Sequence, residues 1–253
     1  MASDRGASPP TCSIIQKAVL RRLGGLGLPA RPAGGPRGTK ILDAPCGSGA
    51  LALALAGEGF DVWGADIEPD AQAWLGERFR AADLNTSLPW PAASFDLLLC
   101  IEGIEHLENR FHFLREAHRL LAAGGRLVIT TPNTVSLRSR VRFLGSGFFH
   151  RDPRPLAEAG RHPLHHIGLL TYPELRYSLH TTGFRIVEVG HTHTKPVSYP
   201  YAFYIPWMWL YTRLAFRKEK DPGQRAHNRE ILKTLFSPSL LFGENLMVVA
   251  QKV

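Results

Sequence analysis

Residues 41–50 read Ile41-Leu42-Asp43-Ala44-Pro45-Cys46-Gly47-Ser48-Gly49-Ala50, a short apolar run that breaks into small residues. The apolar run predicts a buried strand, and the Ala/Leu-rich residues 50–56 predict a helix. The glycines therefore lie in a strand-to-helix turn, where the missing side chains let a ligand approach the main chain. The helix start also offers unpaired N–H groups. We expect a nucleotide-like ligand at this edge of a parallel sheet.

The glycine spacing narrows the kind of ligand. No Lys-Ser/Thr pair follows the glycines, so the turn is not a phosphate-cradling P-loop. The spacing is also not Gly-x-Gly-x-x-Gly, which disfavours a dinucleotide-dependent dehydrogenase. Asp66 closes the next strand-like run, residues 60–66, at about the distance where a βαβ unit places a carboxylate for ribose hydroxyls.

These residues together resemble a known family. The run 42–49 is similar to motif I of class I S-adenosylmethionine-dependent methyltransferases, D-x-G-x-G-x-G, with Pro45 in place of the first glycine. Residues 120–129 resemble the family segment L-x-P-G-G-x-L, with Ala123 where proline is usual. The resemblance implies S-adenosyl-L-methionine as cofactor. It implies cofactor-binding roles for Asp43, Ala44, Pro45, Cys46, Gly47, Gly49, Asp66, Ile67, Asp83, Leu84 and Ile101.

The resemblance also implies the architecture. We expect an α/β, Rossmann-like fold with a seven-stranded, mostly parallel sheet in the order 3-2-1-4-5-7-6 and strand 7 antiparallel. The domain is expected over 39–253, with an insertion at about 195–243. Residues 1–38 are expected to hold a disordered start, a helix that covers the ligand site, and a Gly/Pro/Arg-rich linker.

Periodicity along the chain places further elements. Helices are expected at 13–23, 69–79, 110–121 and 135–144, and one from Thr171, whose side chain would cap it. Strands are expected at 97–101, 126–131, 184–189 and 246–253.

Residues 101–107, Ile-Glu-Gly-Ile-Glu-His-Leu, form a second informative motif. In a helical turn Glu102, Glu105 and His106 would share one face, where two carboxylates and an imidazole can hold Mg²⁺ or another divalent metal. The motif resembles that of ubiquinone-biosynthesis O-methyltransferases and of small-RNA 2′-O-methyltransferases, which implies metal ligands here. The alternative is that Glu105 and His106 only cap and orient the turn. His106 and His166 are candidate catalytic bases, and the pair His165-His166 could supply a fourth ligand; His150, His162, His191 and His193 have no assigned role.

The segment 199–211 holds seven aromatic residues, followed by Arg213, Arg217, Lys218 and Lys220. Aromatic residues beside cations are typical of membrane interfaces, so 199–220 could make a peripheral membrane contact. Prolines and length argue against a transmembrane helix. The alternative is a lid whose aromatic side chains pack on the core.

Bulk composition sets wider bounds. The 253 residues carry a net charge of +8, with scattered arginines that fit an Arg-rich genome better than a nucleic-acid stripe. Three cysteines with no zinc spacing, and no secretion signal, favour a cytoplasmic protein.

The leading hypothesis is methyl transfer to a small, partly apolar acceptor, with oxygen as the expected methylated atom. A metal-dependent RNA 2′-O-methyltransferase is the second, although nucleic acid is not the expected partner. A non-catalytic, methyltransferase-like scaffold or membrane adaptor is the third.

Overall fold

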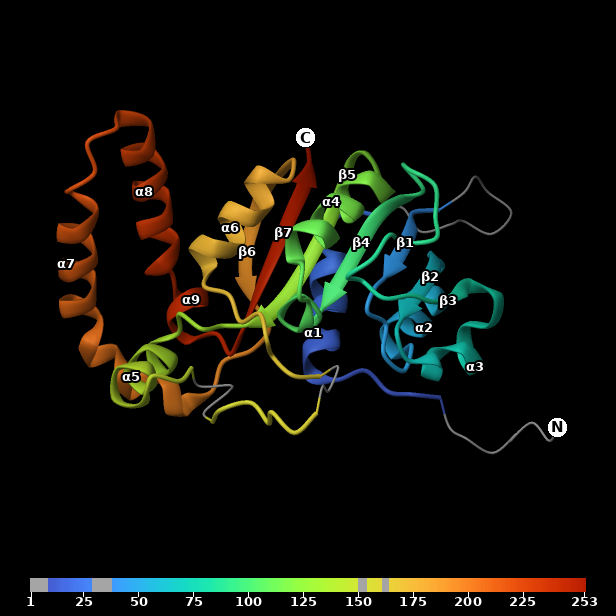
Figure 1. Ribbon diagram of the computed structural model, residues 1–253, viewed down its shortest axis with the longest axis horizontal. Helices are drawn as coiled ribbons and strands as arrows, with labels where there is room; N and C mark the ends of the chain where they lie inside the picture. The colour runs from blue at the N-terminus through green and yellow to red at the C-terminus, as the bar shows by residue number, and fades with distance from the viewer. Residues whose placement is uncertain (1–8, 29–37, 150–153, 161–163) are drawn as a thin grey trace.

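The structure, a computed structural model, describes residues 9–28, 38–149, 154–160 and 164–253. Seven strands in these ranges form one sheet in the order β3-β2-β1-β4-β5-β7-β6 (Figure 1). Their bounds are β1 Lys40–Asp43, β2 Asp61–Asp66, β3 Phe79–Ala81, β4 Phe95–Ile101, β5 Leu121–Pro132, β6 Phe184–His191 and β7 Asn245–Lys252.

Strand direction follows the expected pattern. Strands β1 to β5 pair in parallel, whereas β7 runs antiparallel to both β5 and β6. The expected sheet order and the antiparallel last strand are therefore confirmed.

Helices surround the sheet, and two of them begin with a capping box; the cap at Thr171 was expected from the sequence, and the one at Ser13 was not. The side chains of Ser13 and Thr171 each cap a helix in a reciprocal box with a residue three positions on. The helices are α1 Ile14–Gly24, α2 Ala50–Gly57, α3 Gln72–Leu75, α4 Arg110–Leu120, α5 Leu137–Ser146, α6 Tyr172–Thr181, α7 Ile205–Phe216, α8 Pro222–Leu235 and α9 Pro238–Phe242.

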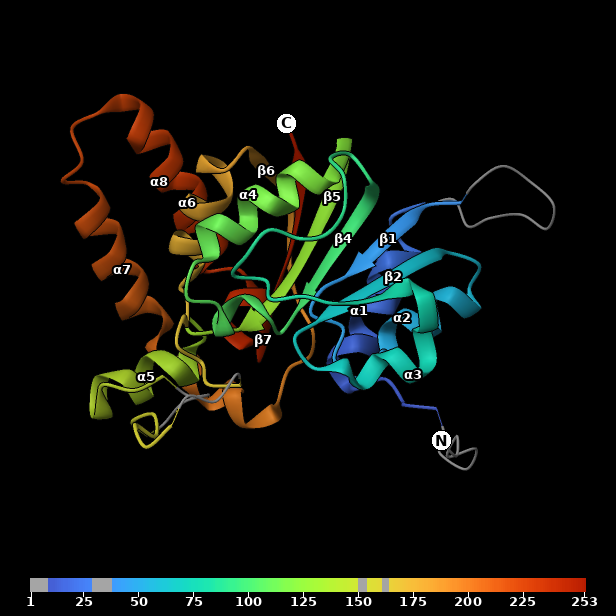
Figure 2. The same cartoon turned by 45° about the vertical axis from the view of Figure 1, so that its right-hand side comes forward.

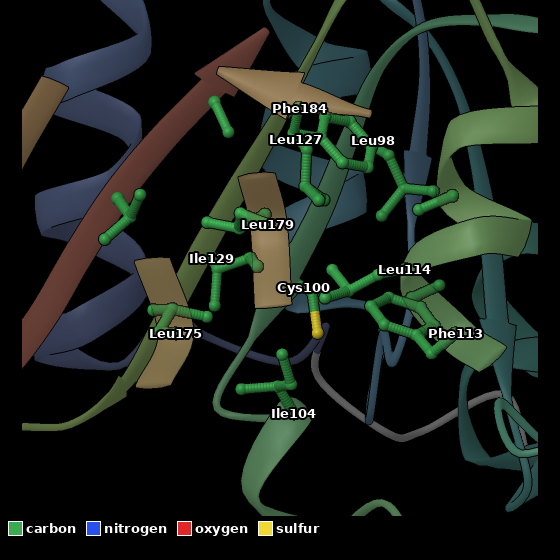
Figure 3. Packing of buried hydrophobic residues seen from close by; sticks show 14 of the residues in the cluster. Leu98, Cys100, Ile104, Phe113, Leu114, Leu127, Ile129, Leu175, Leu179 and Phe184 are labelled. Atoms are coloured by element: carbon green, nitrogen blue, oxygen red, sulfur yellow. The ribbon is translucent and has the colours of Figure 1, made fainter. Parts of the chain in front are cut away.

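The core lies on both faces of the sheet because successive strand residues point in opposite directions. On one face, Leu98, Cys100, Leu127 and Ile129 pack against α4 and α6, as Figure 3 shows. On the other face, Ile41, Leu97, Leu99 and Val128 pack against α1 and α2. The two layers fix β1 and β4 and therefore the loops that leave their ends. Figure 2 shows α4 lying across β4 and β5, with α7 and α8 standing away from the sheet.

The prediction of one continuous helix over 69–79 is wrong. The chain instead forms three short pieces, Pro69–Ala71, Gln72–Leu75 and Gly76–Arg78, and enters β3 at Phe79. Gly76 has a φ of 55°, which no residue in a right-handed helix adopts. The expected linker lies mostly outside the described residues, as do 1–8 of the expected disordered start.

Within the described residues, no helix combines the length and the apolar character that crossing a bilayer requires.

Candidate functional site

The candidate site lies where β1, β2 and β4 end. These parallel strands stop at one edge of the sheet, with Asp43, Asp66 and Ile101 as their last residues. The order reverses here, since β2 lies on one side of β1 and β4 on the other. Such a switch point in an open α/β sheet leaves a crevice for a ligand.

The glycine turn leaves β1 at this edge. Its backbone is tied to both neighbours, because Ala44 N–H donates to Leu99 O and Cys46 N–H donates to Ala65 O, each at 2.9 Å. Gly47 and Gly49 have φ values of 51° and 82°, a region that favours glycine. A Cβ at Gly47 would meet no atom within 4 Å, so the turn presents its main chain to open space.

Two glycines of neighbouring segments let the turn sit this close to the sheet. A Cβ at Gly103 would collide with Cδ of Pro45 and lie 2.7 Å from its Cγ. A Cβ at Gly64 would lie 3.0 Å from Sγ of Cys46. Pro45 therefore has a packing partner where the family motif has glycine, and the turn geometry depends on residues of β2 and of the β4 loop.

Asp66 is tied to the glycine turn. Its Oδ2 accepts the Gly47 N–H at 2.7 Å and its Oδ1 accepts the Glu68 N–H at 3.1 Å. The side chain is nearly buried, and hydrogen bonds from N–H groups to a carboxylate are strong because the acceptor is charged. The next residue, Ile67, directly follows the end of β2 and is 55% exposed.

Asp43 is buried without compensation. Within the described residues, neither carboxylate oxygen has a hydrogen-bond partner, and the residue is 1% exposed. Burial, and secondarily the charge of Asp66, raises the pKa of this carboxyl well above its usual range. A cationic ligand would offset that penalty. Together with the open face of Gly47, this orphaned acid fits S-adenosylmethionine, whose sulfonium and ammonium are positive.

Asp83 and Leu84 lie on the loop after β3. Leu84 is buried, while Asp83 Oδ1 accepts the Asn85 N–H at 2.8 Å. Asn85 Oδ1 in turn accepts the Glu108 N–H at 2.9 Å, which ties this loop to the start of α4. The cofactor-binding role expected for the pair Asp83-Leu84 therefore falls on an anchored loop beside the crevice.

The structure separates Glu102 from the other two residues of the predicted metal set. Glu102 adopts a φ of 51°, and its Oε2 accepts the Asn245 side-chain N–H at 2.6 Å. The turn that follows is a 3₁₀ helix, Ile104–His106, so the helical face expected for all three residues does not form. Glu102 is thus directed toward β7.

Glu105, His106 and His166 do come together. One ligand atom from each lies within 4.8 Å of the other two. The rings of His106 and His166 are 4.9 Å apart, and the buried Glu105 accepts a hydrogen bond from the Thr131 hydroxyl at 2.9 Å. Glu105 and His106 follow the end of β4, on the loop whose Gly103 lies against Pro45 of the glycine turn.

A loop from a distant part of the chain completes this group. The Gly168 N–H donates to Glu105 O at 2.8 Å, and His106 Nδ1 lies 3.1 Å from His165 O. A carbonyl oxygen can only accept, so Nδ1 carries the hydrogen and Nε2 carries the basic lone pair of the neutral ring. His165 contributes its carbonyl here, and His166 contributes its ring.

Of the other histidines, His191 Nδ1 lies 3.0 Å from the Ser239 hydroxyl, and His193 Nδ1 lies 3.0 Å from that of Thr192. His150 and His162 lie outside the described residues. Sequence reasoning missed Thr131 and Asn245, which hold the two glutamates. The pairing of β4 with β5, which places Ile101 opposite Thr130, brings Thr131 to the site. The pairing of β5 with β7, which places Pro132 opposite Asn245, brings Asn245.

The aromatic segment forms a 3₁₀ stretch, Pro196–Tyr204, and α7. The expectation that its aromatic side chains pack on the core is wrong for most of them. Phe203 is 83% exposed and Trp207 is 60% exposed, and Met208 is the buried residue of α7.

The fold, the glycine turn and the three strand-end residues define a class I, S-adenosylmethionine-dependent methyltransferase. The sequence matches the family described as a methyltransferase domain over residues 15–189, and the chain belongs to this family. This assignment favours an enzyme over the scaffold hypothesis.

Named relatives agree with the family. The chain is 32% identical over 156 residues to the 27-O-demethylrifamycin SV methyltransferase of Amycolatopsis mediterranei, covering 53% of this chain and 55% of that protein. It thus spans about half the length of that relative. It is 23% identical over 179 residues to the ubiquinone biosynthesis O-methyltransferase of Acinetobacter baylyi, covering 67% and 73%.

A solved structure shares the fold. The crystal structure of a SAM-dependent methyltransferase from Archaeoglobus fulgidus superposes with a TM-score of 0.56 at 20% identity, covering 93% of this chain and 92% of that one.

Proposed function

We propose that this protein transfers the methyl group of S-adenosylmethionine to a hydroxyl oxygen of a small, partly apolar acceptor. The observation that carries the proposal is the His106–His166 pair, 4.9 Å apart beside the end of β4. A hydroxyl acceptor needs a group that removes its proton, and two imidazoles lie together where the loop after β4 meets the loop before α6. The buried Glu105 lies directly beside them.

The protein has two tasks in this reaction: it aligns the acceptor oxygen with the methyl group, and it removes one proton from the acceptor. The sulfonium of the donor supplies an already activated methyl group. Holding the acceptor oxygen in line with it lowers the barrier through proximity. The acceptor hydroxyl loses its proton as the C–O bond forms and the C–S bond breaks. The Nε2 lone pair of His106 accepts that proton, since Nδ1 is held by the His165 carbonyl.

The same three side chains can hold a divalent metal. Two imidazoles and one carboxylate form a donor set typical of Zn²⁺, Mn²⁺ or Fe²⁺ sites, and less typical of Mg²⁺, which prefers oxygen ligands. Such an ion would lower the pKa of a coordinated hydroxyl. In that form of the proposal, Glu105, His106 and His166 are the ligands, and Glu102 is not.

The comparisons support oxygen as the acceptor atom. Two relatives, from Amycolatopsis and Acinetobacter, carry O-methylation in their names. No observation on the described residues favours RNA as the acceptor.

A panel of small phenols, aliphatic alcohols and amines tests the proposal, with S-adenosylhomocysteine formation as the readout. Turnover of hydroxyl compounds and loss of turnover in His106→Ala is the expected result. A matched control is His180→Ala, an exposed histidine on α6. Turnover of amines alone would contradict the proposal.

Metal dependence is read in the same assay after treatment with a chelator. Restoration by Mn²⁺ or Zn²⁺ in the parent protein, absent in Glu105→Gln and His166→Ala, would support the metal-assisted form. Full activity in the chelator assigns the histidines to proton transfer without an ion.

A further inference from the structure

Helices α7 and α8 form a hairpin that projects from the rest of the molecule, at the left of Figure 1. The hairpin is joined to the body through Met208, which packs with Leu137 and Leu241, and through an ion pair between Arg176 of α6 and Glu230 of α8. Its outer surface belongs neither to the site at the ends of β1, β2 and β4 nor to the group formed by Glu105, His106 and His166. It therefore needs a separate explanation.

One face of the hairpin is apolar and exposed. Phe203, Trp207, Leu210, Tyr211 and Leu214 recur at intervals of three and four residues, so in α7 and the turn before it they share one face. Their exposed fractions run from 49% to 83%, and the rings of Trp207 and Tyr211 stack at 6.0 Å. A contiguous row of large apolar side chains in water marks an interaction surface.

The space between the two helices is basic. A cavity of about 840 Å³ lies there, lined by Arg213, Arg217, Arg225 and Arg229 together with Asn228 and apolar side chains. Segment 199–235 carries seven Lys or Arg against three Asp or Glu. The acids are engaged elsewhere: Asp221 caps α8, Glu230 pairs with Arg176, and Glu219 accepts two backbone N–H groups.

Aromatic and leucine side chains beside a cluster of cations match the interface of an anionic bilayer. Trp and Tyr favour the headgroup level, leucines reach the acyl boundary, and arginines bind phosphate. Single-stranded RNA also uses aromatic and basic residues, but it gives no reason to expose Leu210 and Leu214 on the same face. The charge and the apolar row therefore favour a membrane.

We propose that the α7–α8 hairpin docks on the surface of a membrane containing anionic phospholipids, with the apolar face of α7 in the interfacial zone and the arginines at the lipid phosphates. The contact is peripheral, in keeping with the length and composition of the described helices. It stands on its own observations, separate from the proposed acceptor chemistry.

Flotation with vesicles tests the proposal. The parent protein is expected to float with equimolar phosphatidylglycerol and phosphatidylcholine, weakly with phosphatidylcholine alone, and less at high salt because screening weakens the phosphate contacts. Absence of flotation with the anionic vesicles would overturn it. So would displacement from them by a single-stranded RNA oligonucleotide at equal charge, which would assign the surface to nucleic acid.

Two double variants separate the two halves of the surface. Trp207→Ser with Tyr211→Ser should abolish flotation with both kinds of vesicle. Arg213→Gln with Arg217→Gln should lower the partition coefficient on anionic vesicles about thirtyfold and leave the weak binding to neutral vesicles. Parent-like flotation of either would overturn the proposal.

The controls are matched in residue type and exposure. Tyr177→Ser on α6, where the tyrosine is 64% exposed, and Arg185→Gln on β6 should float like the parent protein. Binding of S-adenosylhomocysteine, unchanged in all variants, checks that each one is folded. A control that loses flotation as fully as the hairpin variants would also overturn the assignment.

Discussion

The imidazole rings of His106 and His166 lie 4.9 Å apart, although one follows β4 and the other lies on a loop before α6. Two hydrogen bonds hold the loops together: the Gly168 N–H donates to Glu105 O, and the His106 ring donates from Nδ1 to His165 O. The pair thus depends on hydrogen bonds to main-chain carbonyls and not on packing of the rings alone.

This relationship makes the two histidines act as a unit. His106→Ala and His166→Ala are each expected to lower kcat by about 10²- to 10⁴-fold, the usual contribution of a positioned base. Their double variant should lose far less than the product of the two, because neighbouring groups are not additive. Single-turnover rates measure this, with the affinity for S-adenosylhomocysteine as the fold check. If the loss of kcat in the double variant equalled the product of the two single losses, the two histidines would act independently, which would contradict this prediction.

Asp43→Asn should stabilise the ligand-free protein while weakening donor binding. Because burial raises the pKa of Asp43, its contribution to stability is present below the ordinary value of 3.8 and is lost as pH rises through the folded-state pKa. At neutral pH the amide removes that cost, so the free energy of unfolding should rise by about 1–3 kcal/mol.

Urea unfolding at several pH values measures the Asp43 effect. The extra unfolding free energy of the Asp43→Asn variant should shrink toward zero as the pH falls below 3.8. Calorimetry should show at least roughly tenfold weaker binding of S-adenosylhomocysteine, about 1.4 kcal/mol, because its ammonium loses a charged partner. A less stable Asp43→Asn protein with unchanged affinity would mean that this carboxyl is structural.

Gly103→Ala tests the packing of the β4 loop on the glycine turn. The added Cβ would collide with Pro45, so we expect a loss of about 1–3 kcal/mol in unfolding free energy, and weaker donor binding. Gly145→Ala is the matched control, since its Cβ meets nothing within 4 Å and it lies in α5. That change should stabilise by about 0.5–1 kcal/mol. Equal effects of the two changes would contradict the predicted role of Pro45.

Glu116 and Arg119 clamp the loop that carries Asp83 and Leu84. Arg119 donates to Glu116 and to the carbonyls of Trp90 and Leu88, at 2.7 and 3.1 Å, and Glu116 accepts the Leu88 N–H at 3.0 Å. The hydrogen bond from Arg119 lowers the pKa of Glu116 below its ordinary value of 4.5. The contribution of this clamp to folding stability is therefore fully present above pH 4.5 and is lost as the pH falls through the lowered pKa of Glu116.

Arg119→Met should remove that contribution. We expect a fall of about 1.5–3 kcal/mol in unfolding free energy at neutral pH, the usual value for hydrogen bonds to a charged group. The difference from the parent protein should narrow at pH values well below 4.5. Urea unfolding at neutral and acidic pH measures both. A difference that does not change with pH would show that Arg119 acts through packing alone.

The sheet and the donor turn could be predicted because local chemistry specifies them. Glycines that need a positive φ, and the acids that end β1 and β2, can be identified one residue at a time. The helix expected over 69–79 rests on Pro69 and the acids beside it as a start signal. It breaks at Gly76, because a start signal does not say where a helix ends.

The acceptor side could be predicted only in part. His166 was a candidate, but its place beside Glu105 depends on the docking of a loop through Gly168 N–H. The direction of Glu102 depends on Asn245, which β7 brings from the far end of the chain. The exposure of Trp207 depends on the absence of any described element above it, which periodicity does not encode.

The central claim is a donor site built on Asp66 and the glycine turn. Calorimetric titration of S-adenosylhomocysteine into the parent protein and into Asp66→Ala tests it most directly. The Asp66 carboxylate accepts the N–H groups of Gly47 and Glu68 and so holds the glycine turn in shape. We predict that S-adenosylhomocysteine binds the parent protein saturably. Removing two charged hydrogen bonds should weaken this binding at least roughly tenfold in the variant. Absence of binding by the parent protein, or equal binding by the variant, would contradict this account.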